Sequence, residues 1–244
     1  MMKISIVVPV FNEAENIFPL LEDIESAMTN AQACEIIYVD DGSNDETPAI
    51  LRLALQEFEG LRVIRHRQSY GQSAAIRTGV MQAQYPIIAT LDGDGQNDPD
   101  DIPRLYENLF KLRQRTPDLW MIAGWRKARQ DSWWRIFSSK VANVVRMALL
   151  KDDTLDTGCG LKVFLRDKFL ELPYFDHMHR YLPALVIRAG GKVISAQVKH
   201  RPRQRGVSKY DTLGRLWVGI IDLMGVIWLI RRSSRIDAEE INRG

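Results

Sequence analysis

Short apolar runs alternate with helical stretches through the first hundred residues, and this alternation leaves few folds open to the chain. We predict strands over 4–10, 35–40, 61–66 and 86–91. We predict helices over 13–28 and 72–84, and a further helix that follows the second strand and is capped near Ser43 or Asp45. Strands and helices alternating at this spacing form right-handed βαβ units. The fold class is therefore α/β, with a mostly parallel sheet that carries helices on both faces and binds ligands at the carboxyl ends of its strands.

The second half of the chain is less regular. The pattern indicates a fifth strand near 119–124, an amphipathic helix over 132–150, a late strand over 192–198 and a basic loop over 199–211. A length of 244 residues fits one main domain, and no linker or repeat divides it. We expect a catalytic domain over 1–211, an apolar helical segment over 212–235 and a polar tail over 236–244.

Composition excludes several classes of protein. Apolar residues make up 45% of the chain and charged residues 26%, so a disordered chain is excluded. Two cysteines, Cys34 and Cys159, cannot form a disulfide framework, and the first residues lack the pattern of a signal peptide. We therefore expect a reducing, cytoplasmic compartment.

Charge is distributed unevenly along the chain. Residues 1–100 carry 6 Lys and Arg against 16 Asp and Glu, whereas residues 101–244 carry 27 against 15. An acidic half that can hold a metal is thus followed by a basic half that can face phosphates or anionic lipid. Solvated surface charge is the alternative explanation.

The most informative motif is the acidic turn LDGDGQNDP at 91–99, directly after a predicted strand. The carboxylates of Asp92 and Asp94 and the amide of Gln96 can converge on one hard cation that prefers oxygen ligands. Such a cation would neutralise a diphosphate and stabilise it as a leaving group. A solvated acidic turn is the simpler alternative, and the Glu that completes an EF-hand calcium loop is missing.

Two further polar segments, 40–45 and 9–13, follow neighbouring predicted strands. A carboxylate at the first can accept hydrogen bonds from a base or ribose, although Ser43 and Asp45 are also typical helix caps. No phosphate-binding P-loop and no dinucleotide-binding GxGxxG motif follows a strand. The histidines lack the spacing of zinc ligands, and we interpret His177 and His179 as surface or core groups.

These strand ends together resemble the family 2 glycosyltransferases with a GT-A fold. The resemblance is closest to the dolichol-phosphate mannose synthase-like branch, which makes polyprenyl-phosphate sugars. It extends over about residues 4–211 and rests on PVFNE (9–13), VDDGSNDET (39–47), HRQSYGQSAAIRTG (66–79), TLDGDGQNDP (90–99) and RQRGVSK (203–209).

The resemblance implies a role for each matching residue. The nucleotide-sugar would contact Pro9, Phe11, Glu13, Val39, Asp41, Asp92, Gly93, Arg203 and Lys209. A Mg²⁺ or Mn²⁺ cofactor would be bound by Asp94 and Gln96, with Asp92 beside it. The acceptor phosphate would be held by Arg126, Arg135 and Ser139. The residues expected to act in catalysis are Asp92, Asp94, Arg126, Arg135 and Arg203.

The chemistry of the acceptor separates the remaining alternatives. A lipid phosphate is largely ionised near neutral pH (second pKa ~6), so it can attack without a strong base, and we expect a single displacement with inversion. A hydroxyl acceptor on a glycan or protein would need a carboxylate base, and Asp152, Asp153 and Asp156 lie where related enzymes place one. A catalytically idle subunit that binds a nucleotide-sugar or lipid is the alternative from another class.

A membrane contact is expected from two apolar segments. Trp133, Trp134 and Phe137 lie beside Arg135, and the stretch 216–230 is flanked by arginines. Fifteen helical residues reach about 22 Å, short of the ~30 Å hydrocarbon core of a bilayer. This favours an interfacial segment, with a core or dimer helix as the alternative.

We therefore expect an enzyme that transfers a sugar from a UDP- or GDP-linked donor to a polyprenyl phosphate. It would work as a peripheral or monotopic protein on the cytoplasmic face of the membrane. It would bind no nucleic acid, and a homo-oligomer is compatible with the sequence.

Overall fold

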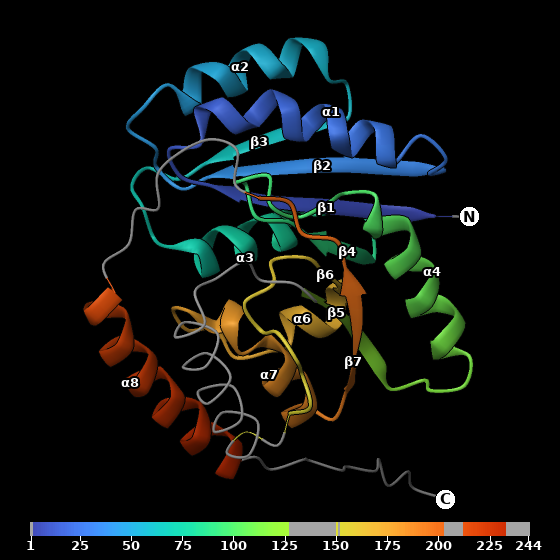
Figure 1. Cartoon of the computed structure of the whole chain (residues 1–244), viewed down its shortest axis with the longest axis vertical. Coiled ribbons are helices and arrows are strands. Elements are labelled where there is room, and N and C mark those ends of the chain that lie inside the picture. The colour runs from blue at the N-terminus through green and yellow to red at the C-terminus, as the bar shows by residue number, and fades with distance from the viewer. Residues whose placement is uncertain (1, 127–149, 151, 203–211, 233–244) are drawn as a thin grey trace, which may run out of the picture.

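A seven-stranded sheet forms the centre of the molecule (Figure 1). The structure, a computed structural model, describes residues 2–126, 150, 152–202 and 212–232. The strands follow the order β3-β2-β1-β4-β6-β5-β7 and comprise β1 (Lys3–Val10), β2 (Ala33–Asp40), β3 (Leu61–Arg65), β4 (Ile87–Thr90), β5 (Leu119–Arg126), β6 (Lys162–Leu165) and β7 (Lys192–Val198). Strand β6 runs antiparallel to β4 and β5, while the other pairs are parallel.

Helices cover both faces of the sheet because its inner strands are apolar on both sides. One face packs against α1 (Ile17–Ala27), α2 (Thr47–Glu57) and α4 (Asp101–Arg113). The other packs against α3 (Gln72–Gln82), α6 (Arg166–Leu170) and α7 (Leu182–Arg188). Successive residues of β1 divide between these layers, as the alternation of a strand requires. The carboxyl ends of β1, β2 and β4 consequently meet at one edge.

The predicted α/β class is confirmed, and most predicted elements lie within a few residues of the observed ones. Helices α4, α6 and α7 and the antiparallel strand β6 are not among the predicted elements. One cap is corrected: the Ser43 hydroxyl accepts a hydrogen bond from the Asn12 backbone (2.8 Å), while Asp45 accepts the Thr47 backbone N–H at the start of α2 (2.9 Å). The helix predicted over 132–150 lies almost wholly outside the described residues.

Helix α8 (Thr212–Arg231) covers the C-terminal apolar stretch and lies along the lower half of the molecule (Figure 1). Val226 is buried in the core, and Asp222 in the middle of the helix pairs with the His177 ring nitrogen Nδ1 at 3.0 Å. The Arg188 guanidinium donates to the Leu229 carbonyl at 3.0 Å. Among the described residues, no helix combines the length and apolarity needed to cross a bilayer.

Candidate active site

A cleft of about 600 Å³ opens at the carboxyl edge of the sheet. Its walls come from the ends of β1 and β4, the start of α3 and two segments that follow later in the chain, 157–160 and 176–180. The polar strand ends singled out in the sequence therefore meet in one cavity. Such a position is where parallel α/β sheets bind their ligands.

Asp92 and Asp94 lie together on the floor of this cleft. The Gln72 side-chain amide donates to Asp92 Oδ1 at 2.8 Å, and the Gln96 backbone N–H donates to Asp94 Oδ1 at 3.1 Å. Burial and the neighbouring charge of Asp94 raise the pKa of Asp92 to about 6, while Lys162 and Arg126 act in the opposite direction. Two adjacent carboxylates with few compensating donors form a site of negative potential.

The donor set fits a hard divalent cation that shares its coordination with a substrate. Among the described residues, no group of three or more His, Cys, Asp or Glu side chains is arranged to enclose a metal. Mg²⁺-type sites commonly use one or two carboxylates and complete their coordination with water and substrate phosphates. Asp92 and Asp94 match that arrangement, whereas Gln96 lies in the same turn but does not line the cleft.

Two glycines allow close packing of the chain around these carboxylates. A Cβ atom at Gly93 would lie 2.5 Å from Val10 Cγ1, and a Cβ at Gly160 would lie 2.3 Å from the carboxyl carbon of Asp92. The Thr90 hydroxyl donates to the Gly160 carbonyl at 2.7 Å and fixes this segment against β4. The position of Asp92 thus depends on the absence of a side chain at residue 160.

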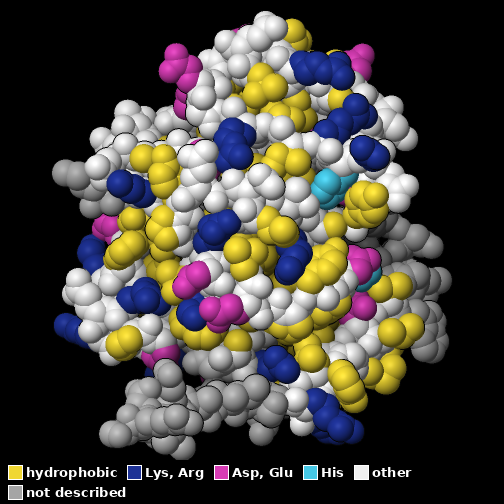
Figure 2. Space-filling model, turned by 180° about the vertical axis from the view of Figure 1, so that it is seen from behind, with side chains coloured by type: hydrophobic (Ala, Val, Ile, Leu, Met, Phe, Trp, Pro, Cys, Tyr) yellow, Lys and Arg dark blue, Asp and Glu magenta, His cyan; other side chains and the backbone are white. Residues whose placement is uncertain are grey.

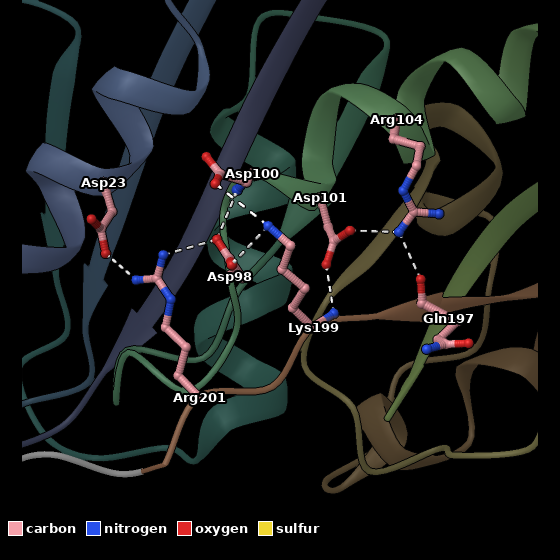
Figure 3. Close-up of polar contacts among 8 residues, drawn as sticks. All are labelled: Asp23, Asp98, Asp100, Asp101, Arg104, Gln197, Lys199 and Arg201. Carbon is pink, nitrogen blue, oxygen red and sulfur yellow. Dashed lines mark hydrogen bonds and ion pairs between the residues drawn. The ribbon is translucent and has the colours of Figure 1, made fainter. Parts of the chain in front are cut away.

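A cluster of ion pairs fixes the end of the acidic turn to the end of β7. Figure 3 shows Arg201 between the carboxylates of Asp23 and Asp98, with its Nη2 atom 2.9 Å from Asp98. Lys199 lies 3.6 Å from Asp98, and its backbone N–H donates to Asp101 at 2.7 Å. The Arg201 backbone N–H also donates to the Gln96 carbonyl at 3.0 Å. The turn is therefore held from both sides.

We predict that Arg201→Gln lowers stability and weakens divalent-cation binding together. The substitution leaves the buried Asp98 carboxylate without its guanidinium, which costs roughly 1–3 kcal/mol in the free energy of unfolding. A loosened turn should also raise the Mn²⁺ dissociation constant several-fold, measured by electron paramagnetic resonance. Urea unfolding gives the stability.

Lys111→Gln is the matched control for this prediction, because Lys111 is exposed and, within the described part of the chain, pairs with Glu107 on α4 alone. An exposed pair of this kind contributes little to the free energy of unfolding. Loss of stability in Arg201→Gln with unchanged Mn²⁺ affinity would contradict a role of the cluster in positioning the turn.

The residues expected at the nucleoside divide between the cleft and the core. Pro9, Phe11 and Glu13 line the cleft, and Phe11 is 36% exposed. Val39 is instead completely buried among apolar residues of β1 and α3, with Gly79 beside it. The Val39 side chain is therefore a core residue and not a wall of the cleft.

Asp41 lines the cleft, but its carboxylate is hydrogen-bonded to a neighbouring loop. It accepts hydrogen bonds from the backbone N–H groups of Tyr70 (2.9 Å) and Gly71 (2.8 Å) and from the Ser69 hydroxyl (2.7 Å), and it lies 2.7 Å from His66 Nδ1. In the described structure, Asp41 therefore orders the loop at the start of α3. That loop in turn forms part of the cleft wall.

Arg126, expected at the acceptor phosphate, is held by a carboxylate. Its Nε and Nη2 atoms donate to Asp156 at 2.6 and 3.0 Å, and both side chains are largely buried. Asp156 precedes the segment 157–160 that lines the cleft, so the guanidinium lies beside the site. The remaining candidates Arg135, Ser139, Arg203 and Lys209 lie outside the described residues.

The structure adds a buried lysine that no sequence motif indicates. Lys162, at the start of β6, lines the cleft and donates to the carbonyls of Cys159 and Thr157. Burial lowers its pKa, while nearby Cys159 and Asp92 act to raise it. Only the glycine-rich TGCG stretch before it could have signalled a close backbone approach to a ligand.

A second added wall is formed by Asp176, His177, His179 and Arg180, around the 3-10 turn η2 (Met178–Arg180). The Ser73 hydroxyl lies 2.8 Å from His179 Nδ1, and burial lowers the pKa of His179 well below its ordinary value. The His179 imidazole is therefore neutral. His177 and His179 thus line the cleft. From the sequence alone they are interpreted as surface or core groups, because they lack the spacing of zinc ligands.

Comparison with known proteins identifies the family. The profile described as Glycosyl transferase family 2 matches residues 5–172. The chain belongs to this family. The predicted family 2 glycosyltransferase and its GT-A-like fold are therefore confirmed.

Curated relatives of this family 2 glycosyltransferase span nearly all of its length. It is 35% identical over 239 residues to the dodecaprenyl-phosphate galacturonate synthase of Rhizobium johnstonii, covering 96% of this chain and 69% of the relative. It is 34% identical over 214 residues to the undecaprenyl-phosphate 4-deoxy-4-formamido-L-arabinose transferase of Proteus mirabilis, covering 86% of this chain and 64% of the relative. The chain thus spans about two thirds of the length of these relatives.

Solved structures share the fold at low identity. The glucosyl-3-phosphoglycerate synthase of Mycobacterium tuberculosis, in complex with Mn²⁺, UDP and phosphoglyceric acid, has a TM-score of 0.67 at 17% identity, covering 96% of this chain and 80% of that one. The mannosyltransferase PcManGT of Pyrobaculum calidifontis, in complex with GDP-Man and Mn²⁺, has a TM-score of 0.60 at 19% identity, covering 84% and 58%. These similarities establish the fold of the glycosyltransferase.

Proposed function

We propose that this family 2 glycosyltransferase moves a sugar from a nucleotide-sugar to a polyprenyl phosphate. The observation that carries the proposal is the Asp92–Asp94 pair in a cleft at the carboxyl edge of the sheet. Relatives at 34–35% identity are named for sugar transfer to dodecaprenyl or undecaprenyl phosphate, which supports the same acceptor class here. The product would be a lipid-linked sugar donor for the cell envelope.

The donor is proposed to extend along the cleft from the end of β1 to the floor. Phe11 offers an exposed ring for stacking against a base, and Glu13 offers a carboxylate to a ribose hydroxyl. Asp92 and Asp94 would hold Mg²⁺ or Mn²⁺, which supplies charge neutralisation of the diphosphate when bound. Gln72 keeps Asp92 oriented through its amide hydrogen bond of 2.8 Å. Arg203 and Lys209 remain proposed contacts of the diphosphate.

The acceptor phosphate is proposed to approach beside Arg126. Its guanidinium, bound by Asp156 through Nε and Nη2, is fixed in direction and keeps Nη1 for a phosphate oxygen. The ionised phosphate attacks the sugar carbon and the nucleoside diphosphate leaves, so the configuration at that carbon inverts. Because the nucleophile needs no deprotonation, Asp156 can remain a positioning group.

The surface of α8 supports a membrane-bound acceptor. Several of its apolar side chains are exposed, including Ile221 (62%), Met224 (58%) and Trp228 (61%), with Arg231 and Arg232 exposed at its end. Hydrophobic side chains gather over this lower part of the molecule in Figure 2. An apolar helical face bordered by arginines matches the interface of an anionic bilayer. We propose peripheral binding at the cytoplasmic face.

We predict that Trp228→Glu weakens binding to phosphatidylglycerol-containing vesicles by at least tenfold in a flotation assay. Burying an exposed indole in the interface contributes on the order of 2 kcal/mol, and a new negative charge adds repulsion from anionic lipid. Leu53→Glu is the control, because Leu53 is 50% exposed on α2, away from α8 (Figure 1). Equal vesicle binding by the Trp228 variant and the native chain would exclude α8 as the membrane contact.

The proposed reaction is tested directly with purified protein. The protein is incubated with Mg²⁺ or Mn²⁺, a panel of UDP- and GDP-sugars, and undecaprenyl phosphate in detergent, and lipid products are identified by mass spectrometry. A lipid-linked sugar that requires both metal and lipid supports the proposal. Transfer to a soluble hydroxyl acceptor alone, or binding of nucleotide-sugar without turnover, would replace it with the corresponding alternative.

A further inference from the structure

Among the described residues, two Lys or Arg side chains line the cleft, and they differ in their hydrogen bonding. Lys162 donates to two backbone carbonyls. Arg180 is half-buried, and within the described part of the chain its guanidinium makes no hydrogen bond and no ion pair. By contrast, Arg126 beside the cleft is bound by Asp156. An arginine that is partly desolvated without a partner is expected to gain one from a ligand.

The segment that carries Arg180 is fixed in place. Met178, Tyr181 and Leu182 on either side are almost fully buried, and the Tyr181 hydroxyl donates to the Gly219 carbonyl of α8 at 3.2 Å. The Arg180 backbone N–H donates to the His177 carbonyl at 3.0 Å. A fixed backbone limits the reach of the guanidinium to the wall of the cleft next to it.

Hydrogen bonds connect this wall to the floor where the sugar–phosphate bond is proposed to lie. Gln72 contacts Asp92, and the next residue along α3, Ser73, contacts the neutral His179. Besides Arg180, this side of the cleft presents an amide, a hydroxyl–imidazole pair and the carboxylate of Asp176. These suit sugar hydroxyls, whereas a phosphate site gathers several cations or backbone N–H groups.

We propose that Arg180 binds a carboxylate on the donor sugar, so that the preferred donors are nucleotide-linked uronic acids. The planar guanidinium can bind both oxygens of one carboxylate, while His179 and Asp176 contact neighbouring hydroxyls. The inference rests on the proposed function and adds the chemical class of the sugar. It assigns to Arg180 the recognition of the group at the C6 position of a hexose.

The test compares donors that differ only at this position. Values of kcat/KM are measured with UDP-glucuronate against UDP-glucose and with UDP-galacturonate against UDP-galactose, using undecaprenyl phosphate as acceptor. The native enzyme is expected to prefer one uronate over its neutral partner by about 100-fold or more. Equal use of both members of each pair, or preference for the neutral sugar, would overturn the inference while lipid-linked product still upheld the proposed function.

Variants of Arg180 distinguish three anions that it could bind: the sugar carboxylate, the donor diphosphate and the acceptor phosphate. In Arg180→Gln the uronate-to-neutral ratio of kcat/KM should fall about 30-fold or more, and Arg180→Lys should restore part of it. A uniform loss with all donors would assign Arg180 to the diphosphate, and a raised KM for undecaprenyl phosphate would assign it to the acceptor. Either result overturns the inference.

Binding measurements keep the two proposals distinguishable. Calorimetric titration of the full chain with UDP-glucuronate or UDP-galacturonate and Mn²⁺ requires no lipid acceptor. Tighter binding of a uronate than of its neutral partner, lost in Arg180→Gln, supports the inference even if the lipid reaction fails. Arg77→Gln is the control, because Arg77 lies over the Tyr174 ring and does not line the cleft. Loss of the uronate preference in that variant would overturn the assignment to Arg180.

Discussion

Asp94→Asn should lower turnover about 1,000-fold or more while the protein remains folded. The substitution keeps the shape of the side chain but removes one of the two carboxylate charges on the floor of the cleft. Charge neutralisation by a bound divalent cation contributes several kcal/mol to the transition state, and each 1.4 kcal/mol corresponds to a factor of ten in rate. The measurement is release of nucleoside diphosphate at saturating donor and Mn²⁺.

Asp118→Asn is the matched control for this variant. Asp118 directly precedes β5, does not line the cleft, is 42% exposed in its side chain and pairs with Lys192 at 3.0 Å. The same chemical change should therefore leave turnover within about twofold, since exposed pairs contribute little. Retention of most activity in Asp94→Asn would remove the metal role from this carboxylate. A matching loss of Mn²⁺ affinity would assign the effect to cation binding.

The strand ends could be predicted from the sequence because both the periodicity of the chain and the direction of its strands specify their position. Periodicity locates β1, β2 and β4, and their parallel direction brings their carboxyl ends to one edge. Polar residues that follow buried strands, such as Asp41 and Asp92, had to lie near one another. No knowledge of the later chain was needed for this part of the cleft.

The opposite holds for the wall around residues 176–180. Its placement depends on β6 inserting antiparallel between β4 and β5, and on the packing of Met178 and Leu182 beneath it. Neither follows from local periodicity, because β6 is only four residues long and η2 is a single turn. The pairing of His179 with Ser73 joins residues 106 positions apart. Such contacts become visible only in the folded chain.

Asp41 shows a different limit of prediction. Its residue type and its place at the end of β2 correctly put it at the cleft. Its hydrogen bonds are taken by a loop 28–30 residues further along the chain, which the strand pattern does not specify. Helix α8 is a similar case, because the ion pair between Asp222 and His177 joins distant parts of the chain and does not follow from local periodicity.

Gly160→Ala should abolish most activity although it replaces no side chain that is proposed to bind the donor or the metal. The new methyl group would lie 2.3 Å from the carboxyl carbon of Asp92, and the backbone cannot retreat easily because Thr90 holds the Gly160 carbonyl. We therefore expect Asp92 to shift. A displacement of about 1 Å at a reacting centre costs roughly 100-fold in rate, and overpacking of this kind costs about 1–3 kcal/mol in stability.

Gly60→Ala separates the local clash from the general effect of replacing a glycine. Gly60 is exposed, and a Cβ atom there meets the Cys34 carbonyl at an ordinary 3.5 Å. Activity and melting temperature are measured for both variants, together with Mn²⁺ affinity in the presence of UDP. If Gly160→Ala loses rate and Mn²⁺ affinity but melts within a few degrees of the native chain, the position of Asp92 is what the glycine protects. Full activity in Gly160→Ala would show that Asp92 can move without consequence, and the floor of the site would then depend on Asp94 alone.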